Sequence, residues 1–345
     1  MESRVKKTIT NAQVNLLFYI LLLVATFFSR KIFIDSLGNE FVGLTSTLQN
    51  ILGLFNLAEL GISSAIAFSL YKPLFDKNHE RITELISIFG YLYQKIGYII
   101  TGIGIIVAIF LPFIFKKSIL DLGIIYFAYF SYLIISLFTY FFNYKQTLLA
   151  ADQKEYYVTI YYQSANIIKI CVQIVLLLQY KSPYIWLLIE LIFGIIYCFI
   201  LNIKVRQVYP WLHSTIKQGK KNLSNYPEIP KYIKQIFVHK LASVALLNTS
   251  SIFIYSFSSL SLVTYFMNYN LIILKVDALI TQLLNSTSAG VGNLVAEGNK
   301  TKIKKVFEEL LAIRYFIAIL LSLCIYFCIN QFISIWLGAE YLLSN

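Results

Sequence analysis

The chain has 345 residues, of which 58% are hydrophobic and only 13% are charged, and its mean hydropathy is +0.69. Soluble domains are about 45–50% apolar and about 25% charged, so this composition excludes an ordinary soluble domain and indicates a membrane protein. The net charge of +12 would suggest nucleic acid in a soluble protein. Here the charges fall between hydrophobic runs, where membrane topology explains them and no nucleic-acid partner is expected.

Apolar runs of about 20 residues recur along the chain, and each is long enough to cross the hydrocarbon core of a bilayer as a helix. In chain order, spans are predicted at Ala12–Ser29, Phe41–Leu70, Glu84–Phe115, Ile119–Tyr144, Tyr157–Tyr180, Pro183–Ile203, Phe237–Ser258, Leu260–Asn285 and Phe307–Asn330. A tenth span is expected to begin at Phe332. These continuous runs predict an all-α, polytopic transmembrane bundle.

The Lys and Arg residues between the spans orient this bundle, because cytoplasmic loops carry an excess of basic residues. With the N-terminus in the cytoplasm, most basic residues fall in cytoplasmic segments. The segments on the opposite side then hold only Arg30, Lys31, Lys116, Lys117 and Lys181. A cytoplasmic N-terminus is therefore predicted.

Residues 204–236 form a long, strongly basic polar stretch that contains Pro210, Pro227 and Pro230. We predict that this stretch is a cytoplasmic linker. It would join a first transmembrane lobe of six helices, residues 1–203, to a partial second lobe, residues 237–345, with three helices and the start of a fourth. Its basic side chains are expected to lie near the anionic headgroups of membrane lipids, at about 1 kcal/mol per residue.

Polar side chains in three spans share one helix face each, at 100° per residue. The three sets are Thr45, Gln49, Asn56, Glu59 and Ser63; Thr159, Tyr162, Gln163, Asn166, Lys169 and Gln173; and Asn270, Asp277, Thr281, Asn285 and Ser288. Interhelical hydrogen bonds, worth about 0.6 kcal/mol each, explain the neutral residues. Charges at Glu59, Lys169 and Arg314 favour a water-filled cavity, because an ionisable side chain within the membrane costs a few kcal/mol.

A cavity lined by Lys and Arg suits an anionic ligand, because desolvated cations attract phosphate strongly, while amides suit sugar hydroxyls. Our candidates for a substrate cleft are Lys95, Lys169, Arg314, Arg30, Asn166 and Gln163. Glu59 and Asp277 are candidate carboxylates for a coupling cation or proton. An ion pair between Lys169 and Glu190, on adjacent spans, is a purely structural alternative.

Sequence signatures of catalysis are absent from the chain. It has no Walker A, HExxH, CxxC or DxD sequence, and its three histidines are scattered. The four cysteines lie in apolar runs, where such residues usually behave as small hydrophobes. Gly97, Gly102 and Gly104 in the third span are expected to permit close helix packing. We therefore expect no enzyme, no cofactor and no metal.

Two blocks of the sequence resemble the bacterial polysaccharide-export flippases, of the O-antigen type, in the multidrug/oligosaccharidyl-lipid/polysaccharide (MOP) superfamily. The first block comprises Arg30, Phe33, Leu37-Gly38, Glu40, Gly43-Leu44, Asn50-Ile51-Leu52, Ala58-Glu59-Leu60-Gly61-Ile62, Ala65 and Ser69-Leu70-Tyr71-Lys72-Pro73-Leu74. The second comprises His239-Lys240, Tyr265, Asn268-Tyr269, Ser288-Ala289-Gly290-Val291-Gly292-Asn293-Leu294, Trp336-Leu337-Gly338 and Tyr341-Leu342. Together they span most of the chain.

The resemblance implies a MATE-like fold, in which two lobes of six helices surround a central cleft that opens alternately to each side. It also implies a function in the bacterial inner membrane. There, an oligosaccharide linked to undecaprenyl pyrophosphate is flipped from the cytoplasmic to the periplasmic leaflet, for O-antigen, capsule or exopolysaccharide synthesis. In such flippases, cations in the cleft are thought to meet the pyrophosphate. Other membrane proteins of polysaccharide assembly are implied partners.

Two features depart from the family pattern. Many relatives carry an acidic residue after a threonine in the seventh helix, where this chain reads Thr249-Ser250-Ser251. The sequence ends at Asn345, so the second lobe is expected to be truncated. Two alternative functions stay open: an ion-coupled exporter of drugs or small molecules with the same fold, and a membrane glycosyltransferase or polymerase.

Overall fold

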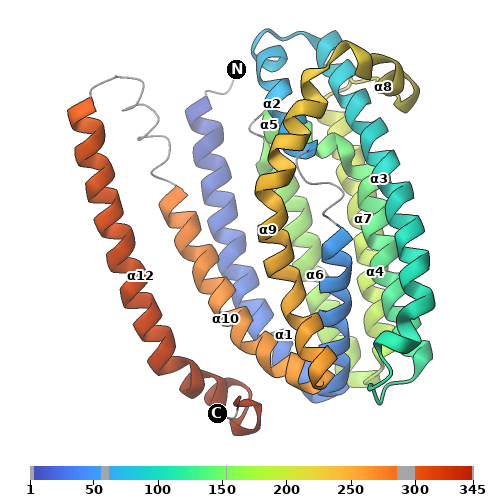
Figure 1. Ribbon diagram of the computed structural model, residues 1–345, viewed down its shortest axis with the longest axis vertical. Coiled ribbons are helices and arrows are strands. Elements are labelled where there is room, and N and C mark those ends of the chain that lie inside the picture. The colour runs from blue at the N-terminus through green and yellow to red at the C-terminus, as the bar shows by residue number, and fades with distance from the viewer. Residues whose placement is uncertain (1–3, 56–61, 153, 286–299, 344–345) are drawn as a thin grey trace. The chain divides into compact units, whose positions relative to one another are not determined.

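The computed structural model describes residues 4–55, 62–152, 154–285 and 300–343, and its side chains over these ranges except 4–12, 64, 236–247 and 282–285. The helices are α1 (Arg4–Phe55), α2 (Ile62–Phe75), α3 (His79–Ile114), α4 (Leu122–Phe142), α5 (Gln146–Ala151), α6 (Glu155–Tyr180), α7 (Pro183–Val208), α8 (Ile216–Asn222), α9 (Glu228–Phe257), α10 (Leu260–Asn285) and α12 (Lys300–Trp336) (Figure 1). Among the described residues, seven helices are long and apolar enough to cross a membrane. The chain is a multi-pass membrane protein, as predicted.

Helix α1 runs through the first predicted span and into the second, and it is broken at Gly38. The backbone there has φ 79° and ψ 164°, a conformation that only glycine adopts without strain. The second predicted span is divided: α1 ends at Phe55 and α2 begins at Ile62, with residues 56–61 outside the described ranges. Near the C-terminus, Phe332 begins no new helix, because α12 continues to Trp336.

The chain divides into two compact units, Met1–Val263 and Thr264–Asn345. In the first unit α3, α4, α7 and α6 pack side by side in that order, α1 packs against α6 and α9, and α2 packs against α3 (Figure 1). The core includes Phe41 and Leu48 of α1 and Phe89 of α3, all of which are fully buried. The predicted lobe boundary at residues 204–236 stays a prediction.

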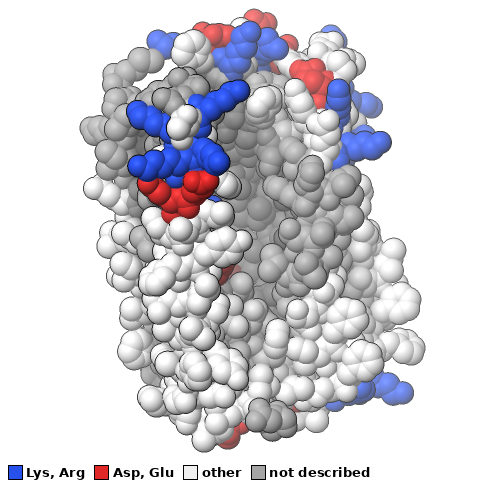
Figure 2. Space-filling view, turned by 60° about the vertical axis from the view of Figure 1, so that its left-hand side comes forward, with Lys and Arg blue, Asp and Glu red and all other residues white. Residues whose placement is uncertain are grey.

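The outer surface of the helices is apolar. Ile109 and Phe113 of α3 are 67% and 77% exposed, and Leu178 of α6 is 64% exposed. Figure 2 shows that on the visible face the charged residues lie mostly toward the ends of the helices, with a largely uncharged surface between. Such exposed apolar side chains are unfavourable in water and match a surface that faces lipid.

Close packing between α3 and its neighbours depends on glycine at seven-residue intervals. A Cβ on Gly90, Gly97 or Gly104 would lie within 2.8 Å of a neighbouring side chain. The side chains that meet these three positions belong to Tyr144, Phe141 and Leu133. The expected packing role is confirmed at Gly97 and Gly104, but Gly102 faces open space.

The segment between α7 and α9, residues 209–226, is fastened to the first unit, and we call it the strap. Its helix α8 crosses the start of α3 so closely that a Cβ on Gly219 would overlap the carbonyl oxygen of Ser87. The hydroxyl of Ser87 accepts a hydrogen bond from the backbone N–H of Thr215 (3.1 Å). The strap therefore belongs to the packed body of the first unit rather than forming a loose linker.

Both ends of the strap are also held by tyrosines. Tyr209 donates a hydrogen bond to Asp152 (2.9 Å), and Tyr226 donates one to Glu84 (2.6 Å). Burial, together with the carboxylate of Asp152, raises the pKa of Tyr209, which keeps its hydroxyl protonated as the donor. The opposite face of α8 is basic, with Lys217, Lys220 and Lys221 exposed. 

The second unit is held together near one end of α12. Tyr269 of α10 donates a hydrogen bond to Asn330 of α12 (2.7 Å). Tyr265 of α10 packs edge-on against Tyr341, which follows α12, with ring centroids 5.5 Å apart. Three residues that carry the sequence resemblance, Tyr265, Tyr269 and Tyr341, thus contribute to the contacts of this unit.

Candidate functional site

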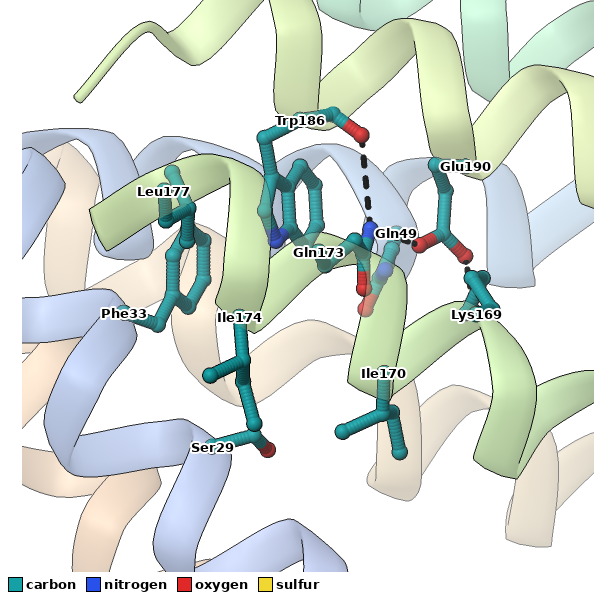
Figure 3. A pocket seen from close by; sticks show the side chains of 10 residues that line it. All are labelled: Ser29, Phe33, Gln49, Lys169, Ile170, Gln173, Ile174, Leu177, Trp186 and Glu190. Atoms are coloured by element: carbon teal, nitrogen blue, oxygen red, sulfur yellow. Dashed lines mark hydrogen bonds and ion pairs between the residues drawn. The ribbon is translucent and has the colours of Figure 1, made fainter. Parts of the chain in front are cut away.

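A largely buried ion pair joins α6 and α7 in the first unit. The amine of Lys169 on α6 is 2.6 Å from Oε1 of Glu190 on α7, and their side chains are only 15% and 16% exposed. The amide of Gln173 donates to the other carboxylate oxygen of Glu190 (3.0 Å) and to the carbonyl of Trp186 (3.3 Å) (Figure 3). We call Lys169, Gln173 and Glu190 the ion-pair cluster.

The local sequence explains why these side chains meet. Lys169 and Gln173 are four residues apart and therefore share one face of α6. A short turn joins α6 to α7: Lys181 takes a left-handed conformation (φ 45°), and Pro183 occupies the first turn of α7. Such a turn makes the two helices antiparallel neighbours, and the pair Trp186 and Glu190 then faces the polar side of α6.

Each charge of the pair is compensated by neighbouring groups, as a charge shielded from water requires. Lys169 neutralises Glu190, and Gln173 satisfies the second carboxylate oxygen. Removing one partner of such a pair is strongly destabilising, since it leaves an uncompensated charge away from water. The structural alternative considered for Lys169 and Glu190 is therefore present, and it occurs together with a cavity on each side.

The first cavity, of about 210 Å³, lies between α1, α6 and α7 (Figure 3). Helix α1 contributes Ser29, Phe33 and Gln49 to its lining, and the ion pair forms part of its wall. The rings of Phe33 and Trp186 stack with centroids 4.5 Å apart and planes 9° from parallel. This cavity thus joins an aromatic wall to a polar one.

The second cavity, of about 160 Å³, lies between α4, α6 and α7 and is lined by the same ion pair. Its other polar lining comes from Thr139, Tyr162, Asn166 and Tyr197. The rings of Tyr162 and Tyr197 pack edge to face, 4.9 Å apart. Lys169 and Glu190 therefore form a wall that the two cavities share.

The polar face predicted for α6 serves both of the purposes considered for it. Thr159 donates a hydrogen bond to Asn15 of α1 (2.8 Å), which is the expected helix-to-helix contact. About two and three turns later, Asn166 and Lys169 line a cavity. The carbonyl oxygen of the Gln163 side chain is buried and accepts no hydrogen bond from any described residue.

The remaining predicted site residues lie elsewhere. Arg30 is half-buried on α1, next to Ser29 of the first cavity, and lines neither cavity. Lys95 is an exposed residue of α3 whose amine lies 4.8 Å from the ring centre of Tyr91. Arg314 and Asp277 are exposed residues of the second unit, and Glu59 falls outside the described residues. Their roles in a cleft or in coupling stay predictions.

Sequence reasoning missed the aromatic and tyrosine lining of the site. Trp186 and Tyr197 of α7, and Tyr132 of α4, which lies beside Glu190, were not among the candidates. One signal was available for Trp186, since it precedes Glu190 by four residues and shares its helix face. No pattern within α4 marked Tyr132, because its relevance depends on which helix packs beside it.

Comparison with known proteins places the fold. No family model matches the sequence, and no curated protein matches it. Among solved structures, the chain is similar to an inward-facing conformation of a multidrug resistance MATE family transporter of the MOP superfamily. The TM-score is 0.66 at 15% sequence identity, covering 96% of this chain and 76% of that chain. The polytopic helical bundle therefore has a MATE-like fold, as predicted.

Proposed function

We propose that this protein is a transporter of the bacterial inner membrane that flips an oligosaccharide linked to undecaprenyl pyrophosphate from the cytoplasmic to the periplasmic leaflet. The observation that carries the proposal is a largely buried lysine, Lys169, on the shared wall of two cavities in a MATE-like bundle. A positive charge inside a membrane protein is costly and commonly marks the path of a substrate or ion.

The lining of the cavities supports an anionic, sugar-bearing passenger. A lysine amine binds phosphate as a strong point charge, and charge-assisted hydrogen bonds gain strength away from water. Asn166, Gln173 and Gln49 offer amides, which donate to and accept from sugar hydroxyls. Each cavity is smaller than the 300 Å³ or more typical of a site for a drug-sized ligand. We infer that they hold only the charged portion of the passenger.

An ion-coupled exporter of drugs or small molecules is a second candidate. The similar solved structure is a multidrug resistance transporter, and the ion pair offers a carboxylate as well as an amine. A cationic drug would bind Glu190, whereas a pyrophosphate would bind Lys169. The two candidates therefore make opposite demands on the same pair.

The test is genetic complementation in a bacterium that carries this gene, with the gene deleted and variants restored. We expect the double variant Lys169→Met/Glu190→Gln, which leaves neither charge of the pair without its partner, to reduce surface polysaccharide sharply while the protein inserts at the normal level, and Lys169→Arg to retain part of the activity. The matched control is Lys116→Ala, which removes an exposed lysine outside both cavities. Normal polysaccharide in the deletion strain, with increased sensitivity to cationic drugs, would refute the flippase proposal and support the exporter.

A further inference from the structure

We propose that the ion-pair cluster links anion binding to protonation: an anionic group binds Lys169 as Glu190 takes up a proton. This inference rests on the proposed function, because it assumes that the passenger presents an anionic group to the cluster. It goes further by assigning a proton-binding role to Glu190, which is neither of the two carboxylates that sequence reasoning selected.

The geometry supplies the first step. Lys169 and Glu190 line both cavities, so a ligand in either cavity meets the amine and the carboxylate together. The amine is already paired at 2.6 Å. An anion that approaches Lys169 is therefore repelled by the carboxylate of Glu190, which is already in direct contact with the same amine.

Charge balance supplies the second step. The intact pair is neutral overall, so an anion that binds beside it gives the site a net negative charge. The two side chains are only 15% and 16% exposed, so this charge would be about 85% shielded from solvent. Such a charge is strongly unfavourable away from water. Protonation of Glu190 removes the repulsion and leaves Lys169 to pair with the anion, so the site stays neutral.

Among the described residues that line the two cavities, no other charged side chain lies near Glu190 to balance a bound anion in place of its protonation. Lys169 is the charged neighbour from α6, while α1 presents Gln49 and α7 presents Trp186. The other titratable groups that face the carboxylate are tyrosines: Tyr132 from α4, Tyr162 from α6 and Tyr197 from α7. Tyrosines are neutral around neutral pH.

Gln173 suits both protonation states of Glu190. Its amide now donates to the carboxylate. An amide also carries an acceptor oxygen, so the same side chain accepts a hydrogen bond from the neutral acid after rotation. Glu190 is thus held in place whether or not it carries a proton.

Linkage fixes the sign and size of the effect. If one proton is taken up with each anion, the affinity for the anion falls about tenfold per pH unit once Glu190 is ionised in the free protein. A cation that binds Glu190 has the opposite dependence, because it competes with the proton. The sign of the pH dependence therefore separates an anionic passenger from a cationic one.

The experiment is calorimetric titration of the purified full-length chain, in a neutral detergent, with dibutyl phosphate. This phosphodiester keeps a single negative charge around neutral pH, so its own titration does not interfere. Repeating the titration in buffers of different ionisation enthalpy gives the number of protons taken up per anion. We expect close to one proton for the wild type, and about tenfold weaker binding per pH unit.

Three variants make the test specific. Glu190→Gln should bind the phosphodiester with no proton uptake and no pH dependence. Glu155→Gln is the matched control, because it removes an exposed carboxylate at the start of α6, and it should behave as the wild type. The double variant Lys169→Met/Glu190→Gln removes both charges together, which avoids an unpaired buried charge, and it should not bind the probe.

Two results would overturn the inference: wild-type binding without proton uptake, or proton uptake that persists in Glu190→Gln. Failure of the proposed function looks different. If the linkage is observed but surface polysaccharide does not depend on the gene, the cluster is a proton-linked anion site and the passenger is another anion.

Discussion

Substitution of Gly219 by alanine tests whether the strap is a packed part of the first unit. A Cβ at this position would overlap the carbonyl group of Ser87 and would lie 2.9 Å from the backbone nitrogen of Ile88. All of these atoms are backbone atoms of α3, so no side-chain rotation relieves the clash. Ser87 and Ile88 are 1% and 0% exposed, which leaves α3 no room to retreat. Helix α8 must therefore move.

The magnitude follows from three contributions. Overpacking a closely packed contact costs about 1–3 kcal/mol. Loss of the hydrogen bond from Thr215 to Ser87 costs about 1 kcal/mol. Alanine stabilises a helix by about 1 kcal/mol relative to glycine, which offsets one of these losses. We therefore expect Gly219→Ala to destabilise the strap by about 1–3 kcal/mol.

Gly102→Ala is the matched control, because a Cβ there meets nothing within 4 Å. It should be neutral or stabilising by up to about 1 kcal/mol. The assay is trypsin cleavage of the purified protein at the exposed lysines of α8, which requires local unfolding, together with thermal unfolding in detergent. Cleavage as slow in Gly219→Ala as in the wild type, with an unchanged Tm, would refute the close docking of α8.

Replacing Lys169 or Glu190 alone by alanine should lower the free energy of unfolding by about 3–5 kcal/mol, because the partner charge is left uncompensated. The double variant Lys169→Met/Glu190→Leu should stay within about 1 kcal/mol of the wild type in thermal unfolding. Equal losses in the two single variants and the double variant would contradict a compensated pair. Burial, and then the hydrogen bond to Glu84, raises the pKa of Tyr226 from 10.0 to about 12. The neutral phenol is favoured in the folded protein, so its contribution to stability is complete below about pH 10 and is lost as the pH rises through 12. The difference between the absorbance titrations of the wild type and of Tyr226→Phe should show the ionisation of Tyr226 near pH 12. A transition near pH 10 would contradict this prediction. In a cysteine-free background, a cysteine at Lys220 should react with an impermeant thiol reagent only from the cytoplasm, and labelling from outside intact cells would reverse the predicted orientation.

The helices were predictable because hydropathy and length alone decide which segments span a membrane. The ends of the helices were less predictable. Arg30 and Lys31 suggested a loop after the first span, yet α1 continues through them, since a helix that extends beyond the hydrocarbon core tolerates charge. The same reasoning explains why no new helix begins at Phe332. The polar residues Asn330 and Gln331 do not interrupt α12, which ends only near Gly338, where φ is 123°.

The site was predictable in part, for a similar reason. Helical periodicity placed Asn166, Lys169 and Gln173 on one face of α6, and the structure shows that face lining two cavities or bonding to α7. Periodicity within one helix does not specify which neighbouring helix lies opposite. The contributions of Tyr132 and Trp186 depend on packing between helices distant in sequence, so they emerged only from the structure.

The strap also bears on how the protein is made. The contacts that hold it reach back to α3 and to Asp152, all of which are synthesised before Tyr226. Domains generally fold as units, the N-terminal part first, while the ribosome is still extending the chain. The membrane helices up to α7 can thus be held together by the strap before α9 leaves the ribosome. A truncated chain that ends soon after Tyr226 and has been released from the ribosome should already protect α8 from protease.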